Sequence, residues 1–168
     1  MGTVYRKEMR AYLVSPIPYV LIIIFTAFMG WWFFDSRGFF LMRRASMETF
    51  FGISPWIFLF LVPAISMRLW SEESRAGTLE ALQTAPVRSW QLVGGKFLSA
   101  WTLLLICLVA TLPVPITVAI LGDLDWGPVI GGYLGMMFLG AALLGLGLWI
   151  SSLTNHQIVA FLITAVIA

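Results

Sequence analysis

Charged residues are scarce in this sequence. Only 11% of the 168 residues are Asp, Glu, Lys or Arg, whereas an ordinary soluble domain has about 25%. Hydrophobic residues make up 60% of the chain, above the roughly 45–50% that is usual. One small core cannot hide that excess, so lipid must solvate much of the chain. The composition therefore predicts an integral membrane protein and excludes a water-soluble globular domain.

Residue types that commonly carry catalysis or bind metals are also few. The chain has one cysteine, Cys107, which can form no internal disulfide, and one histidine, His156. Ser151 and Ser152 precede His156, but no Gly-x-Ser-x-Gly motif and no third orienting group accompanies them. A serine hydrolase needs all three groups within hydrogen-bond reach, so the pattern argues against an intramembrane enzyme.

Cofactor-dependent and ion-driven functions find no support either. No Walker-type phosphate loop occurs. No paired carboxylates lie within an apolar run, as an ion-driven carrier would require. Met136 and Met137 are neighbours that a helix would point about 100° apart, so they predict no metal site. We therefore predict no catalytic residue, no metal and no cofactor in this chain.

Runs without charged residues are long enough to cross a membrane several times. The expected spans, all in one transmembrane domain, are residues 16–34, 50–69, 97–121 and 128–151. Residues 126–168 would form a helix of about 65 Å, twice the hydrocarbon thickness, so this segment must fold back. The polar cluster Ser151 to Gln157 predicts the turn, which leaves a fifth apolar helix over residues 158–168. Because that helix is too short to cross, we expect the natural protein to continue beyond Ala168.

The ten Lys and Arg residues are spread between the apolar runs and form no continuous face that would bind nucleic acid. Seven of them lie in the N-terminal segment and in the connection after the second span, and three lie in the loop between residues 35 and 49. Cytoplasmic loops carry the excess of positive charge. We therefore predict a multi-pass protein of the plasma (inner) membrane, with the N-terminus and the loop 71–96 in the cytoplasm.

The loop 71–96 contains the pattern of a short helix. Thr78 is suited to the N-cap position, and Glu80 would lie in the first turn, where the helix dipole favours a carboxylate. Leu79 and Leu82 would share one face, and Pro86 would end the helix. The pattern predicts an amphipathic helix at the cytoplasmic mouth of the bundle, and a plain solvated loop is the alternative that it leaves open.

Two segments carry a more specific pattern of residues. The loop contains Met67-Arg68, Glu72-Glu73, Gly77-Thr78-Leu79-Glu80, Leu82, Pro86 and Gly95-Lys96-Phe97, and the N-terminus contains Lys7-Glu8-Met9-Arg10-Ala11-Tyr12, Ser15-Pro16 and Tyr19-Val20. These segments resemble the cytoplasmic loop and the amphipathic entry helix of ABC-2-type transporter permeases, especially the branch that includes gliding-motility permeases. Ser74 stands where that branch has a basic residue, and Ala81 and Gln83 stand where Leu is usual.

The resemblance implies a fold and a function. The fold would be an all-α polytopic transmembrane helix bundle with an N-terminal amphipathic entry helix and a short cytoplasmic coupling helix. The chain would be a permease subunit of an ATP-binding-cassette transporter, paired with a second permease subunit and with a separate cytoplasmic ATP-binding subunit. That partner would hydrolyse ATP, and the permease would translocate a substrate, with a family preference for export.

The coupling helix would contact the ATP-binding subunit. Its implied contact residues are Glu72, Glu73, Arg75, Gly77, Thr78, Leu79, Glu80, Leu82 and Pro86. A different class of function also fits the loop: a non-transporting membrane anchor or assembly factor that docks a soluble partner through it. An ATPase gene beside this one would favour transport.

The fourth expected span contains small residues at helical spacing. Gly131 and Gly135 form one small-xxx-small pair, and Ala141 and Gly145 form another. Such pairs let helix backbones approach closely within a membrane. The sequence leaves two interpretations open, packing within the chain and contact between two subunits.

Overall fold

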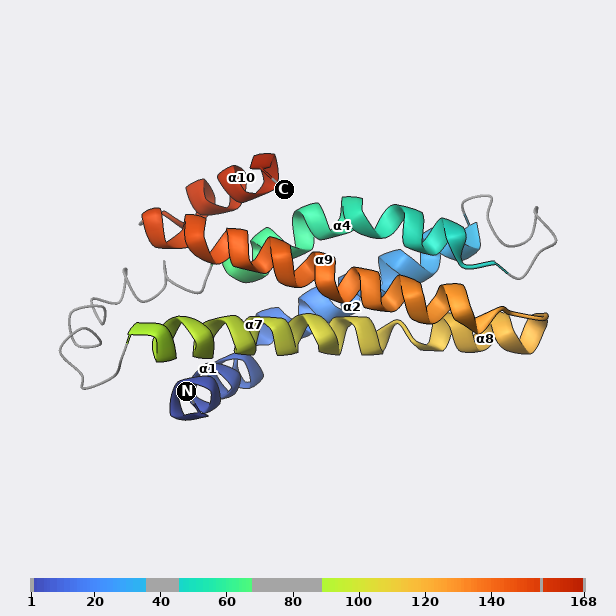
Figure 1. Ribbon diagram of the computed structural model, residues 1–168, viewed down its shortest axis with the longest axis horizontal. Helices are drawn as coiled ribbons and strands as arrows, with labels where there is room; N and C mark the ends of the chain where they lie inside the picture. The colour runs from blue at the N-terminus through green and yellow to red at the C-terminus, as the bar shows by residue number, and fades with distance from the viewer. Residues whose placement is uncertain (1, 36–45, 68–88, 155, 168) are drawn as a thin grey trace.

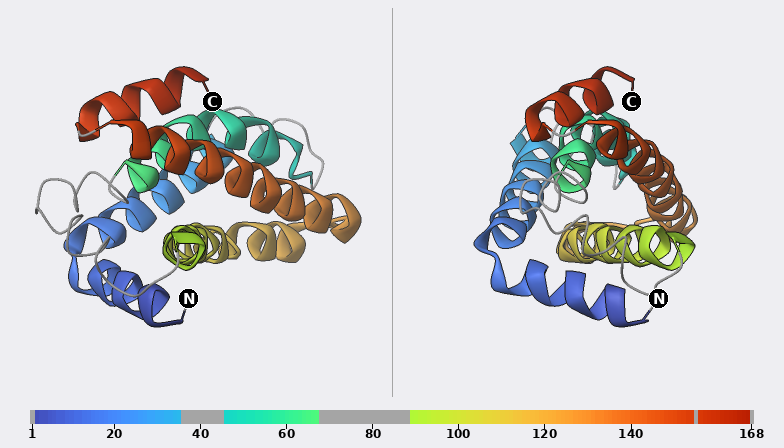
Figure 2. Two further views of the ribbon diagram at one scale, coloured as in Figure 1. Left: turned by 60° about the vertical axis from the view of Figure 1, so that its left-hand side comes forward. Right: turned by 90° about the vertical axis from the view of Figure 1, so that its left-hand side faces the viewer.

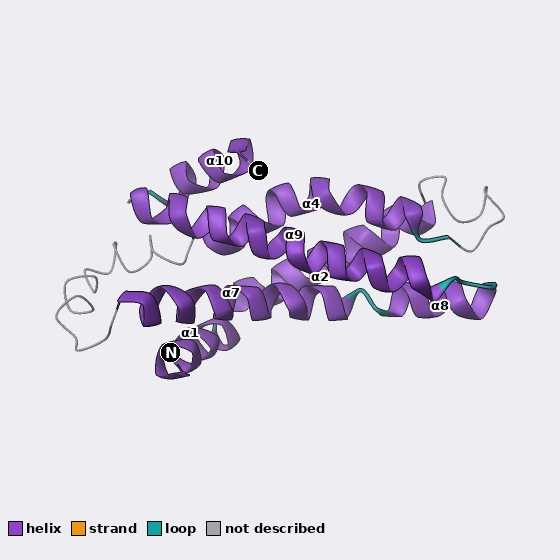
Figure 3. Ribbon diagram, viewed as in Figure 1, coloured by secondary structure: helices purple, strands orange, loops and turns teal. Residues whose placement is uncertain are grey.

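The computed structural model describes residues 2–35, 46–67, 89–154 and 156–167. The helices in these ranges are α1 (Gly2–Val14), α2 (Pro16–Asp35), α4 (Glu48–Ser66), α7 (Ser89–Ala110), α8 (Pro113–Leu121), α9 (Trp126–Leu153) and α10 (Gln157–Ile167). Within each described range short loops join successive helices, and no strand occurs in the described part of the chain (Figure 3). The predicted all-α helix bundle is therefore confirmed.

Within the described ranges, four helical segments are long and apolar enough to cross a membrane. They are Pro16–Asp35, Glu48–Ser66, Trp90–Leu121 and Trp126–Leu153. All four run along the long axis of the molecule (Figure 1), with α9 packed against α4 and α7, and α2 packed against the same two helices. The bundle thus has a loop end, where α4 ends and α7 begins, and an opposite end, where residues 122–125 join α8 to α9.

Aromatic side chains fill much of the core between α2 and α4. Phe33, Phe50 and Phe58 are buried. The ring centroids of Phe33 and Phe50 lie 6.1 Å apart, as do those of Phe25 and Phe58, a distance at which aromatic pairs attract each other. The outer surface is also apolar, and exposed residues such as Ile24, Trp56 and Trp149 lie on it. A bundle that is apolar inside and outside is solvated by lipid.

The third span is interrupted between α7 and α8. Pro113 and Pro115 have no N–H, so the carbonyls of Val109 and Thr111 lose their α-helical donors. Tighter hydrogen bonds replace them, because the N–H of Leu112 donates to Val109 O at 3.1 Å and the N–H of Val114 donates to Thr111 O at 3.0 Å. The backbone polar groups therefore stay satisfied at a depth where no water is available.

Helix α1 crosses the bundle at a steep angle near the loop end. In Figure 1 it is seen almost along its axis below α7, and in the right-hand view of Figure 2 it lies across the picture while the long helices point toward the viewer. Its inward residues Val4, Tyr5 and Glu8 share one face, whereas Arg6 and Arg10 are exposed. This amphipathic pattern suits a helix at a membrane surface.

Candidate functional site

The residues expected to contact an ATP-binding subunit lie outside the described residues. These are Glu72, Glu73, Arg75, Gly77, Thr78, Leu79, Glu80, Leu82 and Pro86. The structure does describe the helices at both ends of this connection, since α4 ends at Ser66 and α7 begins at Ser89. The geometry of the candidate site is therefore the geometry of these two helix ends and of what packs against them.

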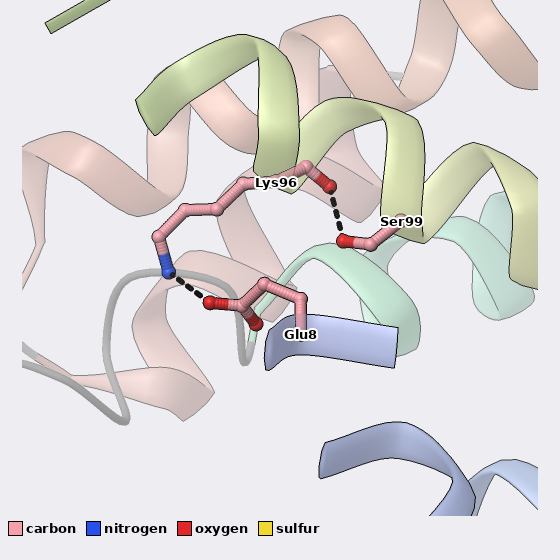
Figure 4. A network of polar contacts seen from close by, with 3 residues as sticks. All are labelled: Glu8, Lys96 and Ser99. Atoms are coloured by element: carbon pink, nitrogen blue, oxygen red, sulfur yellow. Dashed lines mark hydrogen bonds and ion pairs between the residues drawn. The ribbon is translucent and has the colours of Figure 1, made fainter. Parts of the chain in front are cut away.

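A buried ion pair joins α7 to α1. Lys96, near the start of α7, is only 1% exposed, and its Nζ lies 3.3 Å from Oε1 of Glu8, whose side chain is 15% exposed (Figure 4). One turn later, the hydroxyl of Ser99 donates to the carbonyl of Lys96 at 2.8 Å. An ammonium is costly to remove from water unless it is paired. The pair therefore ties the position of α1 to that of α7.

Two further contacts hold the same helices together. A Cβ added to Gly95 would lie 2.9 Å from Cβ of Val4, so the absence of a side chain is what lets α1 approach. The hydroxyls of Tyr5 and Thr102 lie 3.3 Å apart, within hydrogen-bond distance. Together with the ion pair, these contacts fix α1 along the first turns of α7.

The end of α4 is held on the other side of the bundle. A Cβ added to Gly147 of α9 would clash with Oγ of Ser66 and would lie 2.6 Å from Cβ of Ser66 and 3.3 Å from Cγ2 of Thr164 in α10. The Ser66 hydroxyl donates to Pro63 O and the Thr164 hydroxyl to Ala160 O. Each hydroxyl is satisfied within its own helix, so close packing joins α4, α9 and α10 here.

Both helices that flank the 68–88 connection are thus packed tightly against other helices. A family model described as ABC-2 family transporter protein matches residues 2–168. The chain belongs to this family. No curated protein and no solved structure gave a match.

Family membership settles the broad function of this ABC-2 protein. Together with four helical segments that are long enough to cross a membrane, it identifies the chain as a multi-pass membrane permease component of an ABC transporter. The membrane subunits of this family are typically non-catalytic, and membership implies partnership with an ABC ATP-binding subunit in general. Among the described residues of the permease, no group of three His, Cys, Asp or Glu side chains could hold a metal ion.

Three of the four small residues that were expected to allow close helix packing are exposed. Gly131, Gly135 and Gly145 are exposed, and a Cβ on any of them would meet no atom within 4 Å. Ala141 is half-buried. The glycines of α9 that make close contacts are Gly132 against Phe51, Gly140 against Leu104 and Phe58, and Gly147 against Ser66 and Thr164. Gly131, Gly135 and Gly145 therefore contact no other described helix, and both interpretations of the small-residue spacing stay predictions.

Sequence reasoning also missed the ion pair. Glu8 and Lys96 belong to the segments that resemble the family, but nothing in the sequence pairs residues that are 88 positions apart. A signal did exist, because Lys96 directly precedes a long apolar run and Glu8 is the one acidic residue in a basic N-terminal segment. Opposite charges at the edges of two apolar segments are candidates for a pair.

Proposed function

We propose that this permease converts ATP hydrolysis by a separate cytoplasmic subunit into export of a substrate across the plasma membrane. In this arrangement the N-terminus and residues 71–96 are cytoplasmic, and two permease subunits form the translocation path. The observation that carries the proposal is the tight packing of the two helix ends that flank residues 68–88. A partner bound to this connection acts on α4 and α7 together.

The contacts at each helix end determine which other helices would move with α4 or α7. Displacement of the start of α7 would carry α1 with it, because Lys96 and Glu8 are paired and Gly95 contacts Val4. Displacement of the end of α4 would act on α9 and α10 through Ser66 and Gly147. Coupling of this kind requires a structural element that has two arrangements. Binding of the nucleotide and binding of the substrate must each shift the equilibrium between these arrangements.

The face of α9 that carries Gly131, Gly135 and Gly145 supports the proposed pairing of permease subunits. These positions are exposed and leave room for a close helix approach. We therefore place the second permease subunit against this face. The partner would be another copy of this chain or a related permease.

The contact with the ATP-binding subunit can be tested at Leu79 and Leu82. If both side chains are buried against the partner, each contributes roughly 1.5–3 kcal/mol. Changing both to Asp should then weaken association by about a hundredfold or more. The measurement is recovery of the ATP-binding subunit with the purified permease, alongside the amount of permease in the membrane fraction.

A matched control adds the same charge on the other face of the predicted helix. Ala81→Asp with Thr84→Asp introduces two carboxylates that would point away from Leu79 and Leu82, and it should leave recovery of the partner unchanged. Equal recovery with both double variants would reject the docking face.

A membrane anchor would bind its partner without coupling. Stimulation of ATP hydrolysis by substrate in the unmodified complex therefore separates a transporter from an anchor.

A further inference from the structure

An apolar groove runs along the outside of the bundle between α7–α8 and α9. Its volume is about 480 Å³, and its lining includes Leu112 and Ile116 on one wall and Ile130 and Leu134 on the other. These four side chains are exposed at the edge of the groove. The hydroxyl of Tyr133 lies 3.0 Å from that of Thr111, so the polar group in the wall is already paired.

A second hollow of different character adjoins the groove at the end of the bundle where α8 joins α9. Its volume is about 410 Å³, and it is lined by Asp123 and Asp125 together with four uncharged residues, one of which is Trp126. Trp126 also lines the apolar groove, so the two hollows meet at its side chain. Among the residues that the structure describes, the lining holds two carboxylates and no basic side chain, which makes this part of the hollow complementary to a cation.

We propose that the two hollows together bind one phospholipid whose headgroup carries an ammonium. An acyl chain lies in the groove, and the ammonium lies beside Asp123 and Asp125. Trp126, which separates the two hollows, is the residue type that favours the boundary between headgroups and acyl chains. An anionic headgroup is disfavoured because it would face two carboxylates.

The length of the groove matches one acyl chain. Trp126 and Met137 line its two ends on α9 and are eleven residues apart, which corresponds to about 16 Å along a helix. Half of a hydrocarbon core of about 30 Å is nearly the same distance. A chain that starts at Trp126 therefore reaches the middle of the bilayer at Met137, as a lipid of one leaflet does.

Photo-crosslinking of the intact protein in membranes tests the site. The probes are phosphatidylethanolamine and phosphatidylglycerol with the same diazirine-bearing acyl chain, and the labelled peptides are mapped by mass spectrometry. We expect labelling to concentrate on residues 105–137 and to favour phosphatidylethanolamine. Ile116→Trp fills the groove from α8, and loss of only two buried methylene groups weakens binding on the order of tenfold. Ile106→Trp is the matched control, since Ile106 is an exposed isoleucine of α7 outside the groove.

The headgroup is tested with Asp123→Asn and Asp125→Asn combined. Oδ1 of Asp125 accepts a hydrogen bond from the N–H of Gly127 at 3.0 Å and so caps α9, and Asn preserves such a cap. The double variant should keep the total labelling but lose the preference for phosphatidylethanolamine. Unchanged preference would overturn the ammonium site. Equal labelling of Ile116→Trp and Ile106→Trp, or disulfides between copies that carry Ile116→Cys in a Cys107→Ser background, would overturn the lipid site.

Discussion

Lys96 shows how one buried charge can determine where a surface helix lies. Its side chain is 1% exposed at the start of a membrane-crossing segment, and Glu8 reaches it from α1. Buried ion pairs often add little net stability, because desolvation offsets much of the attraction. Removing one partner is still costly, since the other charge stays behind. The pair therefore selects one position of α1 on α7 more than it strengthens the fold.

The first prediction follows from that asymmetry. Lys96→Met keeps the length of the side chain but leaves the carboxylate of Glu8 in a half-buried place. We expect a loss of about 2–3 kcal/mol, somewhat below the value for a fully buried pair because Glu8 is partly exposed, and hence a Tm that is lower by about 5–10 °C. Thermal unfolding of the purified protein in detergent measures it.

Two further variants separate charge from packing. Adding Glu8→Gln to Lys96→Met removes the isolated carboxylate, so most of the lost Tm should return. Arg6→Met removes an exposed cation from the same helix and should change stability by no more than about 0.5 kcal/mol. If the double variant were as unstable as Lys96→Met alone, loss of packing and not charge would explain the effect.

The second prediction compares two glycines of α9 that are two residues apart. Gly147→Ala places a methyl group against Ser66 and Thr164, whereas Gly145→Ala meets no neighbouring atom within 4 Å. Overpacking of this kind costs about 1–3 kcal/mol, and Ala in an open helical position stabilises by roughly 0.5–1 kcal/mol. Thermal unfolding should therefore move in opposite directions for the two variants. Equal shifts would contradict the close contact at Gly147.

These glycines also show what the sequence could not reveal. Small-xxx-small spacing identifies a face of a helix but not whether that face turns inward. In a soluble helix the polar side chains would mark the outer face. Helix α9 has no charged residue, so its sequence gives no such mark. The inward face, with Gly132, Gly140 and Gly147, is determined by contacts with α4, α7 and α10.

At the scale of elements, a polar contact joins the interruption of the third span to α9. The Thr111 hydroxyl donates to Leu108 O at 2.7 Å and lies 3.0 Å from the hydroxyl of Tyr133. Because α8 begins at Pro113, this contact is a polar link between the start of α8 and its neighbour. Tyr133 also lines the apolar groove.

The third prediction measures that link with a double-mutant cycle. Thr111→Val and Tyr133→Phe each remove one hydroxyl, and the combined variant removes both. Hydrogen bonds between membrane helices are worth about 0.6 kcal/mol on average, with values up to about 1.7. We expect a coupling free energy in that range from unfolding of the four proteins in detergent. A coupling of zero would mean that the two hydroxyls do not bond to each other.

The helices were easier to predict from the sequence than the contacts between them. Charged residues and polar clusters separate the apolar runs, and a helix that crosses a membrane must be long and uncharged, so sequence alone predicts an all-α bundle. The two prolines at 113 and 115 also mark where a helix must change its hydrogen bonds. Contacts such as Gly95 with Val4 depend on how α1 crosses α7, which no local pattern of residues encodes.

At the scale of the whole molecule, the two ends of the bundle differ in chemistry. The loop end holds the Lys96–Glu8 pair and the exposed Arg6 and Arg10 of α1. The described residues that join α8 to α9 at the opposite end carry Asp123 and Asp125. Positive charge resists transfer across the membrane during insertion, whereas Asp and Glu contribute little. This difference supports a fixed orientation.

The last prediction concerns that orientation. Seven of the ten Lys and Arg residues belong to the N-terminal segment and the 68–96 region, so we expect both to be cytoplasmic and residues 123–127 to face outward. In a Cys107→Ser background, a membrane-impermeant maleimide added to intact cells should label Asp123→Cys and leave Ser74→Cys unlabelled until the cells are opened. Because Asp123 is exposed, the maleimide can reach a cysteine at this position. Cys107 is buried in the native protein and is replaced here, so no native thiol competes for the label. Labelling of Ser74→Cys in intact cells would place the 68–88 connection outside, where no ATP-binding subunit can reach it, and the proposed coupling would then be rejected together with the topology.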